Sequence, residues 1–152
     1  MIKQELETFD VIGISVRTSN EAGRAAIDIP ALWQRFMAEG IADKIPNKTD
    51  ASLYCIYTDY EKDHTRPYTT VLGCRVTRTD EVPQGMVHVR LGGGLYATRV
   101  AKGNLMQGVV FAAWTEIWNS DLERRYTSDF EVYGAKAQNP EDAEVDIFVA
   151  VR

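Results

Sequence analysis

A chain of 152 residues is long enough to bury one hydrophobic core without disulfides or metal ions to hold it together. Its 17 basic and 22 acidic residues give a net charge of −5 and are spread over both halves, which excludes the concentrated basic face that nucleic acid requires, so we expect no direct nucleic-acid binding. No apolar stretch approaches the roughly eighteen residues of a membrane-spanning helix, and we expect no signal peptide, because a basic segment followed by an apolar one is not seen near Met1. The expected location is therefore cytoplasmic, without membrane contact.

The first half of the chain has the pattern of a strand, a helix and two further strands. Runs rich in Val, Ile and aromatic residues predict strands over residues 9–17, 53–60 and 68–76. Apolar residues at helical spacing predict a helix that begins near Ile29, with Asp28 as the N-cap and Pro30 at the first helical position, and ends at Gly40. We therefore expect a β-α-β-β unit over about residues 1–80.

The second half has the same order of elements. Residues 86–91 predict a short strand, and Gly92-Gly93-Gly94 predicts a turn before the strand that opens the second unit. Further strands are expected over residues 95–101, 130–134 and 145–151, with a helix from about residue 105 to 119. A second β-α-β-β unit is therefore expected over about residues 86–152.

Two stretches of sequence occur twice. Ala-Leu-Trp-Gln-Arg-Phe at residues 31–36 returns as Ala-Ala-Trp-Thr-Glu-Ile at 112–117, and Ser-Leu-Tyr-Cys-Ile-Tyr at 52–57 returns as Ser-Asp-Phe-Glu-Val-Tyr at 128–133. Because the copies keep their order and no linker separates the halves, we expect a single α+β domain over residues 1–152. Its pseudo-symmetric duplicated β-α-β-β units should form an antiparallel sheet with two main helices and a central cleft.

Of the differences between the two copies of the repeated strand, the most informative is that the second has Glu131 where the first has Cys55. Alternation along a strand places Glu131 beside Tyr133 and Cys55 beside Tyr57, whereas the opposite face, with Phe130, is expected to pack under the helices. A carboxylate between tyrosines predicts a pocket for a flat, cationic molecule, because aromatic rings and negative charge both attract cations. The alternative is an ordinary strand acid that is solvated or paired with an arginine.

The tryptophans of the two predicted helices have different expected roles. Trp33 and Trp114 occupy equivalent positions in the repeat, which favours core anchors over ligand contacts. Trp118 lies one turn after Trp114 and has no aromatic counterpart in the first unit. It is therefore a candidate wall of the pocket.

Other reactive residues have no supporting pattern. The spacing of Cys55 and Cys74 is not that of a zinc site. We expect reduced thiols, which a cytosol favours. The alternative is a cross-strand disulfide, because a hairpin centred on residues 64 and 65 would place the two cysteines opposite each other. His64 and His88 do not predict a metal site or a nucleophile–base pair. We expect no metal, no cofactor and no catalytic residue, and a solvated connection over residues 122–125.

Three segments carry a resemblance to a known family: residues 117–120 (Ile-Trp-Asn-Ser), 128–133 and 147–151 (Ile-Phe-Val-Ala-Val). They resemble the GyrI-like (gyrase-inhibitor-like) small-molecule-binding domains, which also serve as effector-binding domains of AraC-type and MerR-type multidrug regulators. The resemblance covers nearly the whole chain. It implies that Glu131 is the buried acid beneath the ligand, that the two units form a cleft for aromatic, often cationic, compounds, and that Tyr96 is an aromatic position of the site.

These observations predict a stand-alone effector-binding module, since no helix-turn-helix segment is expected at either end. Its ligand is expected to be a hydrophobic or cationic small molecule, captured for sensing or sequestration. The expected ligand-binding residues are Glu131, Tyr133, Tyr57, Trp118, Tyr96 and Cys55. Two alternatives come from other relatives: a hydrolase of cyclopropane-containing toxins, in which Glu131 would activate water, and a gyrase-inhibitor-like protein whose partner is gyrase or a regulator.

Overall fold

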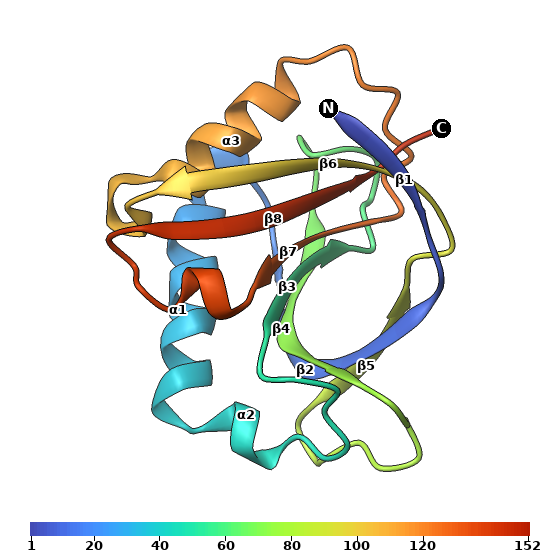
Figure 1. Ribbon diagram of the computed structural model, residues 1–152, viewed down its shortest axis with the longest axis vertical. Helices are drawn as coiled ribbons and strands as arrows, with labels where there is room; N and C mark the ends of the chain where they lie inside the picture. The colour runs from blue at the N-terminus through green and yellow to red at the C-terminus, as the bar shows by residue number, and fades with distance from the viewer.

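An antiparallel sheet of eight strands forms the centre of the protein, and the two main helices lie along one of its faces (Figure 1). The computed structural model describes residues 1–152. The strands are β1 (Ile2–Leu6), β2 (Phe9–Thr18), β3 (Leu53–Thr58), β4 (Tyr68–Val76), β5 (Val87–Leu91), β6 (Gly94–Gly103), β7 (Ser128–Tyr133) and β8 (Ala143–Ala150). The helices are α1 (Ala25–Ala38), α2 (Ile41–Lys44) and α3 (Val109–Trp118), with short 3₁₀ turns η1 (Glu21–Gly23), η2 (Leu105–Gln107) and η3 (Ala135–Ala137). The predicted α+β class is confirmed.

The two repeated units meet in the middle of the sheet. The strand order is β1-β6-β8-β7-β3-β4-β2-β5, so β3-β4-β2 of the first unit and β7-β8-β6 of the second run outward from a shared β3–β7 pair. In that pair Cys55 lies directly opposite Glu131, and these two positions correspond in the repeat. A pseudo-twofold axis therefore passes through this pair. The remaining strands exchange units, because β1 pairs with β6 and β5 pairs with β2.

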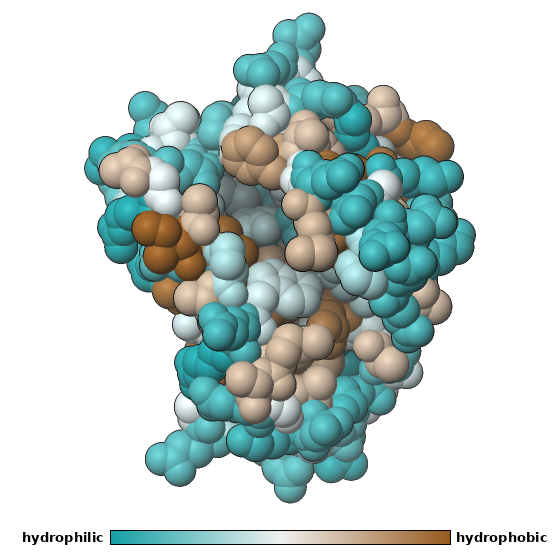
Figure 2. Space-filling view, turned by 90° about the vertical axis from the view of Figure 1, so that its left-hand side faces the viewer, coloured by the Kyte–Doolittle hydropathy of each residue, from teal (hydrophilic) through white to brown (hydrophobic).

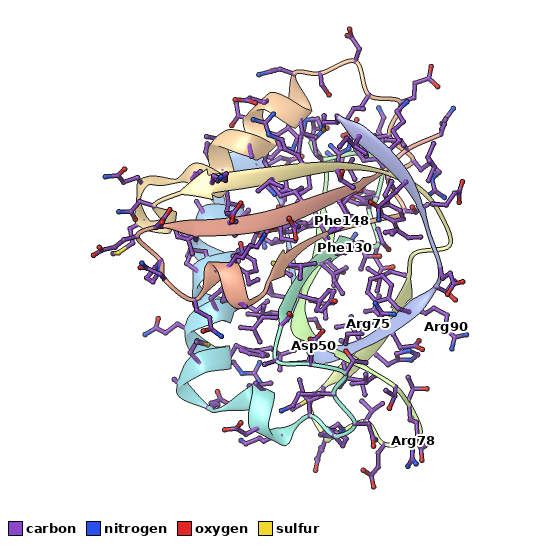
Figure 3. All side chains as sticks on the ribbon, viewed as in Figure 1. Asp50, Arg75, Arg78, Arg90, Phe130 and Phe148 are labelled. Carbon is purple, nitrogen blue, oxygen red and sulfur yellow. The ribbon has the colours of Figure 1, made fainter.

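Both faces of the sheet bury a hydrophobic core. On one face, α1 packs Phe36 and α3 packs Trp114 against the strands. On the other face, Phe9, Tyr96 and Phe130 pack together inside the curl of the sheet, where the Phe130 ring stacks on Phe148 (Figure 3). Their ring centroids are 5.3 Å apart for Phe9 and Phe130, and 5.6 Å apart for Tyr96 and Phe130.

The face that carries Glu131 is the one covered by the helices, and the prediction that Phe130 packs under the helices is wrong. Glu131 and Phe130 do lie on opposite faces of the strand, as predicted. However, the helices cover the face that carries Glu131, and Phe130 lies on the face inside the curl of the sheet. Because the sheet curls, its aromatic face is buried against other parts of the same sheet and needs no helix to cover it (Figure 1). The helices are thus placed above the acid.

Two glycines allow β2 and β4 to approach closely within this curled sheet. Gly13 and Gly73 are paired directly across the two strands. A Cβ atom on Gly73 would lie 2.1 Å from the carbonyl oxygen of Ile12, so no larger residue fits without moving a strand.

The helices and the first strand differ from the sequence prediction. Helix α1 begins at Ala25, before the predicted start, and Pro30 lies inside it. Asp28 does not cap the helix; it accepts a 2.8 Å hydrogen bond from the Thr18 hydroxyl. Gly108, at φ 75°, divides the second predicted helix into η2 and α3. Strand β1 was not predicted, because its side chains are almost all exposed and carry little apolar alternation.

The cysteines are both buried and free. Cys55 lies opposite Leu72 across β3 and β4, so the hairpin register differs from the one that would align Cys55 with Cys74. No disulfide joins the two strands. None of the helices is both long enough and apolar enough to cross a membrane.

Candidate functional site

A cavity of about 730 Å³ opens between α1 and α3, above the middle of the sheet. Figure 2 shows this hollowed face from the side of the two helices, with hydrophobic side chains beside the opening. Twelve of the 18 lining residues are hydrophobic, so a molecule bound there loses much of its contact with water. The lining residues are Asn20, Gly23, Ala25, Ala26, Ile29, Pro30, Trp33, Tyr57, Tyr60, His64, Tyr68, Val110, Phe111, Trp114, Trp118, Arg124, Glu131 and Tyr133.

Glu131 lies at the floor of the cavity and is 1% exposed. Three neutral side chains donate hydrogen bonds to its carboxylate. Tyr57 donates to Oε2 at 2.8 Å, Trp114 Nε1 donates to Oε2 at 2.6 Å, and Tyr133 donates to Oε1 at 2.6 Å. No Lys, Arg or His side chain pairs with it.

Burial raises the pKa of Glu131, because the charged carboxylate loses its water, while the three hydrogen bonds act in the opposite direction. Burial, together with nearby ionisable groups, also raises the pKa of Tyr57 and Tyr133. Both tyrosines therefore keep their protons and remain donors to the carboxylate. When ionised, the cavity floor carries a negative charge that no cation of the protein neutralises.

Asp129, on the same face of β7, has a different environment. It accepts hydrogen bonds from Arg124 Nη2 at 2.8 Å, from the Tyr60 hydroxyl at 2.6 Å and from the Ala150 backbone N–H at 2.8 Å. Arg124 is only 7% exposed and its Cζ lies 4.3 Å from the centre of the Tyr126 ring. The prediction of a solvated connection over residues 122–125 is therefore wrong for Arg124, which neutralises a buried acid.

Aromatic rings from both units close one end of the cavity. His64, in the loop between β3 and β4, stacks on Trp118 of α3 with centroids 5.4 Å apart and an interplanar angle of 5°. Its Nδ1 lies 3.4 Å from the Tyr126 hydroxyl. Burial and the nearby charge of Arg124 lower the pKa of His64, so the ring is neutral near pH 7.

Four of the six residues predicted to bind ligand line the cavity: Glu131, Tyr133, Tyr57 and Trp118. Cys55 does not line the cavity, so the prediction that it binds ligand is corrected. Its thiol donates a hydrogen bond to the Tyr57 hydroxyl at 3.5 Å. Tyr96 is on the opposite face of the sheet, buried against Phe130, so the expectation that it lines the cleft is corrected. The family resemblance implied a site role for Tyr96 from one aromatic residue alone, and the sequence does not show which face of the strand carries this side chain.

The repeated tryptophans contact both the core and the cavity. Trp114 is buried under α3 and donates to Glu131, and Trp33 meets the Tyr133 ring edge to face at 4.8 Å. Sequence equivalence identified them as a pair but favoured core anchors alone. The two roles coincide because the cavity is the gap between the helices that these residues anchor.

Sequence reasoning did not identify several lining residues, among them Tyr60, Tyr68, His64 and Arg124. Tyr60 and Tyr68 flank the predicted hairpin loop and their rings lie 5.7 Å apart, so the aromatic residues at both ends of that loop were an available signal. No local pattern marks Arg124, because its burial depends on how residues 119–127 fold back on the sheet. No group of three or more His, Cys, Asp or Glu side chains is arranged to hold a metal ion.

Comparison with known proteins shows extensive similarity. Residues 4–151 match the family model Cass2, described as integron-associated effector-binding protein. An integron cassette protein from the mobile metagenome of Vibrio cholerae is 33% identical, with a TM-score of 0.78 over 99% of this chain and 95% of that chain. YobU of Bacillus subtilis (strain 168), named for an inferred role in transcriptional regulation, is 30% identical over 144 residues, 92% of this chain and 90% of that protein. SAV2435, solved bound to tetraphenylphosphonium, shares the fold, with a TM-score of 0.80 and 16% identity over 99% of this chain and 93% of that chain.

Proposed function

This chain belongs to the family of integron-associated effector-binding proteins, and on that premise we propose that it binds lipophilic aromatic cations in the cavity between α1 and α3. The observation that carries the proposal is the state of Glu131. Its carboxylate is buried among aromatic rings, fixed by three neutral donors and paired with no cation of the protein. A bound cation would supply the missing charge.

The energetics favour a cation whose charge is spread over a large apolar body. At an effective dielectric of about 20, a carboxylate attracts a unit charge at about 4 Å by roughly 4 kcal/mol. Each aromatic face adds about 0.5 to 2 kcal/mol. A compact ammonium group loses most of this gain because it is strongly hydrated, whereas a delocalised lipophilic cation gives up little water on entering an apolar cavity.

The size of the cavity and one structural neighbour support the same class of ligand. A volume of about 730 Å³ lies within the usual range, about 300–1,000 Å³, for sites that hold drug-sized molecules. SAV2435, which shares the fold, was solved with tetraphenylphosphonium, a cation of this class. We infer that ligand capture serves sensing or sequestration, as in an effector-binding module.

The test compares three phenyl-bearing probes of different charge: the tetraphenylphosphonium cation, the tetraphenylborate anion of the same shape and neutral triphenylphosphine oxide. Binding is followed by calorimetry or tryptophan fluorescence. Tetraphenylphosphonium should bind at least about tenfold more tightly than tetraphenylborate, a difference of about 1.4 kcal/mol. Glu131→Gln should weaken tetraphenylphosphonium by at least about tenfold and leave the neutral probe within about twofold.

The matched control is Asp146→Asn, which removes the same charge from an exposed position on β8 outside the cavity. It should leave all three affinities unchanged within about twofold, because exposed charges are screened by salt. Equal weakening of tetraphenylphosphonium by both variants would mean that only the net charge of the protein matters. Unchanged affinity in Glu131→Gln would refute the counter-ion role.

A further inference from the structure

A second hollow, of about 530 Å³, adjoins the main cavity. Three side chains line both spaces: Trp33 of α1, Val110 of α3 and Tyr133 of β7. The two spaces therefore lie next to each other and share part of their walls. A flexible group that extends from the main cavity into the second hollow would pass these three residues.

The shared wall between the two spaces includes Tyr133, which is hydrogen-bonded to Glu131. Tyr133 holds Glu131 through its hydroxyl at 2.6 Å, and the Tyr133 ring packs edge to face against Trp33, with centroids 4.8 Å apart. Since Trp33 and Val110 come from different helices, the shared wall lies in the gap between α1 and α3. A cation placed beside Glu131 is thus next to this shared wall.

The walls of the second hollow are suited to hydrocarbon. No charged residue lines it, and eight of its ten lining residues are hydrophobic, so a polar substituent would lose water there without a charged partner in return. Leu53 and Leu105 are only half-buried, and Met37 at the rim is 65% exposed. Apolar surface left open to water in this way is stabilised when a hydrocarbon chain covers it.

We propose that this second hollow is a subsite for a linear alkyl chain attached to the cation bound at Glu131. The ligand class is then an amphiphilic cation, with an aromatic onium head in the main cavity and a hydrocarbon tail in the second hollow. The inference rests on the proposed function, because the position of the head determines where the tail begins.

The test uses methyl-, butyl- and decyltriphenylphosphonium, which share one head group. Each fully buried methylene strengthens binding up to about fourfold, so decyl should bind at least about tenfold more tightly than methyl even if the chain is only partly covered. Ala137→Phe, in η3, fills the second hollow without touching the main cavity. It should reduce the decyl-over-methyl gain to less than about threefold and leave the affinity for methyltriphenylphosphonium within about twofold.

The matched control is Ala135→Phe, which adds the same ring to the same 3₁₀ turn at an exposed position outside the hollow. It should keep the full gain. Ala51→Trp, at an exposed position on the rim, blocks the same space if Ala137→Phe does not fold. A gain that is absent in the parent protein, or equal in the parent, blocked and control variants, overturns the subsite. Failure of methyltriphenylphosphonium to bind at all instead refutes the proposed function, and the subsite falls with it.

Discussion

Two acids on one face of β7 are held in different ways. Asp129 is paired with Arg124 at 2.8 Å, so its charge is cancelled inside the protein. Glu131 receives three hydrogen bonds from neutral groups, so its charge, when it is ionised, has no cationic partner in the protein. Burial of a carboxylate without a cationic partner costs free energy. A cation that binds from solvent offsets this cost, so the site favours cationic ligands.

The raised pKa of Glu131 makes cation binding dependent on pH. The carboxylate attracts a cation only when ionised, and burial moves its ionisation above pH 4.5, the usual value for a glutamate. The affinity for tetraphenylphosphonium, which does not titrate, should therefore fall as the pH is lowered through that raised pKa, by up to about tenfold per pH unit. Calorimetric titrations between pH 4.5 and 8 measure this, and Glu131→Gln should lose the part of the dependence that comes from the carboxylate.

His64 also titrates near the cavity, so it needs a control. Its protonation adds positive charge and weakens cation binding in the same direction. In His64→Gln the remaining pH dependence should be that of Glu131. The role of Glu131 would be contradicted if the affinity for tetraphenylphosphonium did not change with pH in His64→Gln but changed in Glu131→Gln as it does in the parent protein. The pH dependence would then come from the histidine.

The same pKa shift affects stability with a defined sign. Because the folded-state pKa of Glu131 is raised, its contribution to stability is fully present below about pH 4.5 and is lost as the pH rises through the folded-state value. The free energy of unfolding of Glu131→Gln should lack this decline. Urea titrations of both proteins across that range would show the difference.

At the residue scale, the sequence indicated Glu131 because an acid between Phe130 and Val132 takes the place of Cys55 in the first copy of the strand. Its hydrogen-bond partner Trp114 could not be identified, since the indole reaches the carboxylate only after α3 packs on the sheet. Arg124 was misjudged for the same reason: its acid partner lies on another element. Contacts between elements leave little trace in a local pattern.

At the element scale, alternation along the strands gave the two faces of the sheet correctly but not which face the helices cover. Phe130 and Glu131 do point in opposite directions. Either face of an alternating strand can be buried, by a helix or by the curl of the sheet, and the periodicity is the same in both cases. Strands such as β2 and β4 were predicted closely, whereas the polar edge strand β1 was not.

The close approach of β2 and β4 requires glycine at residues 13 and 73, which provides a stability test at this scale. Gly73→Ala would place a Cβ atom 2.1 Å from the Ile12 carbonyl oxygen, so β2 and β4 must separate. The free energy of unfolding should fall by at least about 2 kcal/mol, measured by urea denaturation.

Gly85→Ala is the control for Gly73→Ala. Gly85 has φ +84° and no atom near its Cβ position, so this substitution costs only the conformational penalty, about 1 kcal/mol. Equal losses in the two variants would show that the close approach of β2 and β4 has no energetic importance.

At the scale of the whole molecule, the pseudo-twofold axis at Cys55 and Glu131 gives each half an equivalent set of groups around the cavity floor. Tyr57 corresponds to Tyr133 in the repeat, and Trp33 corresponds to Trp114. Trp33 packs against the core cluster that contains Cys55. An acid placed at residue 55 should therefore find a similar set of donors.

Exchanging the two central residues tests this symmetry. The double variant Cys55→Glu with Glu131→Cys should bind tetraphenylphosphonium within about tenfold of the parent protein, because the acid stays beneath the same cavity. Glu131→Cys alone should lose at least about tenfold. Both affinities can be measured by calorimetry. If the exchanged variant binds no better than Glu131→Cys alone, the two halves are not equivalent at the site.

The duplication, the order of the elements and the GyrI-like resemblance were all available from the sequence, and the family match over residues 4–151 confirms the resemblance. What could not be derived was the exchange of β1 and β5 between units, since both are short edge strands whose partners lie far along the chain. The second hollow was also beyond prediction, because it forms only where α1, α3, β7 and η3 meet.

In the proposed complex, a lipophilic cation lies between α1 and α3 with Glu131 as its counter-ion. A crystal structure of the complex with tetraphenylarsonium tests this arrangement most directly, because the anomalous signal of arsenic locates the cation independently of any fitted ligand shape. We predict one strong arsenic peak inside the main cavity, with Glu131 as the nearest carboxylate. A peak outside the cavity, or nearest to another acid, would contradict the account.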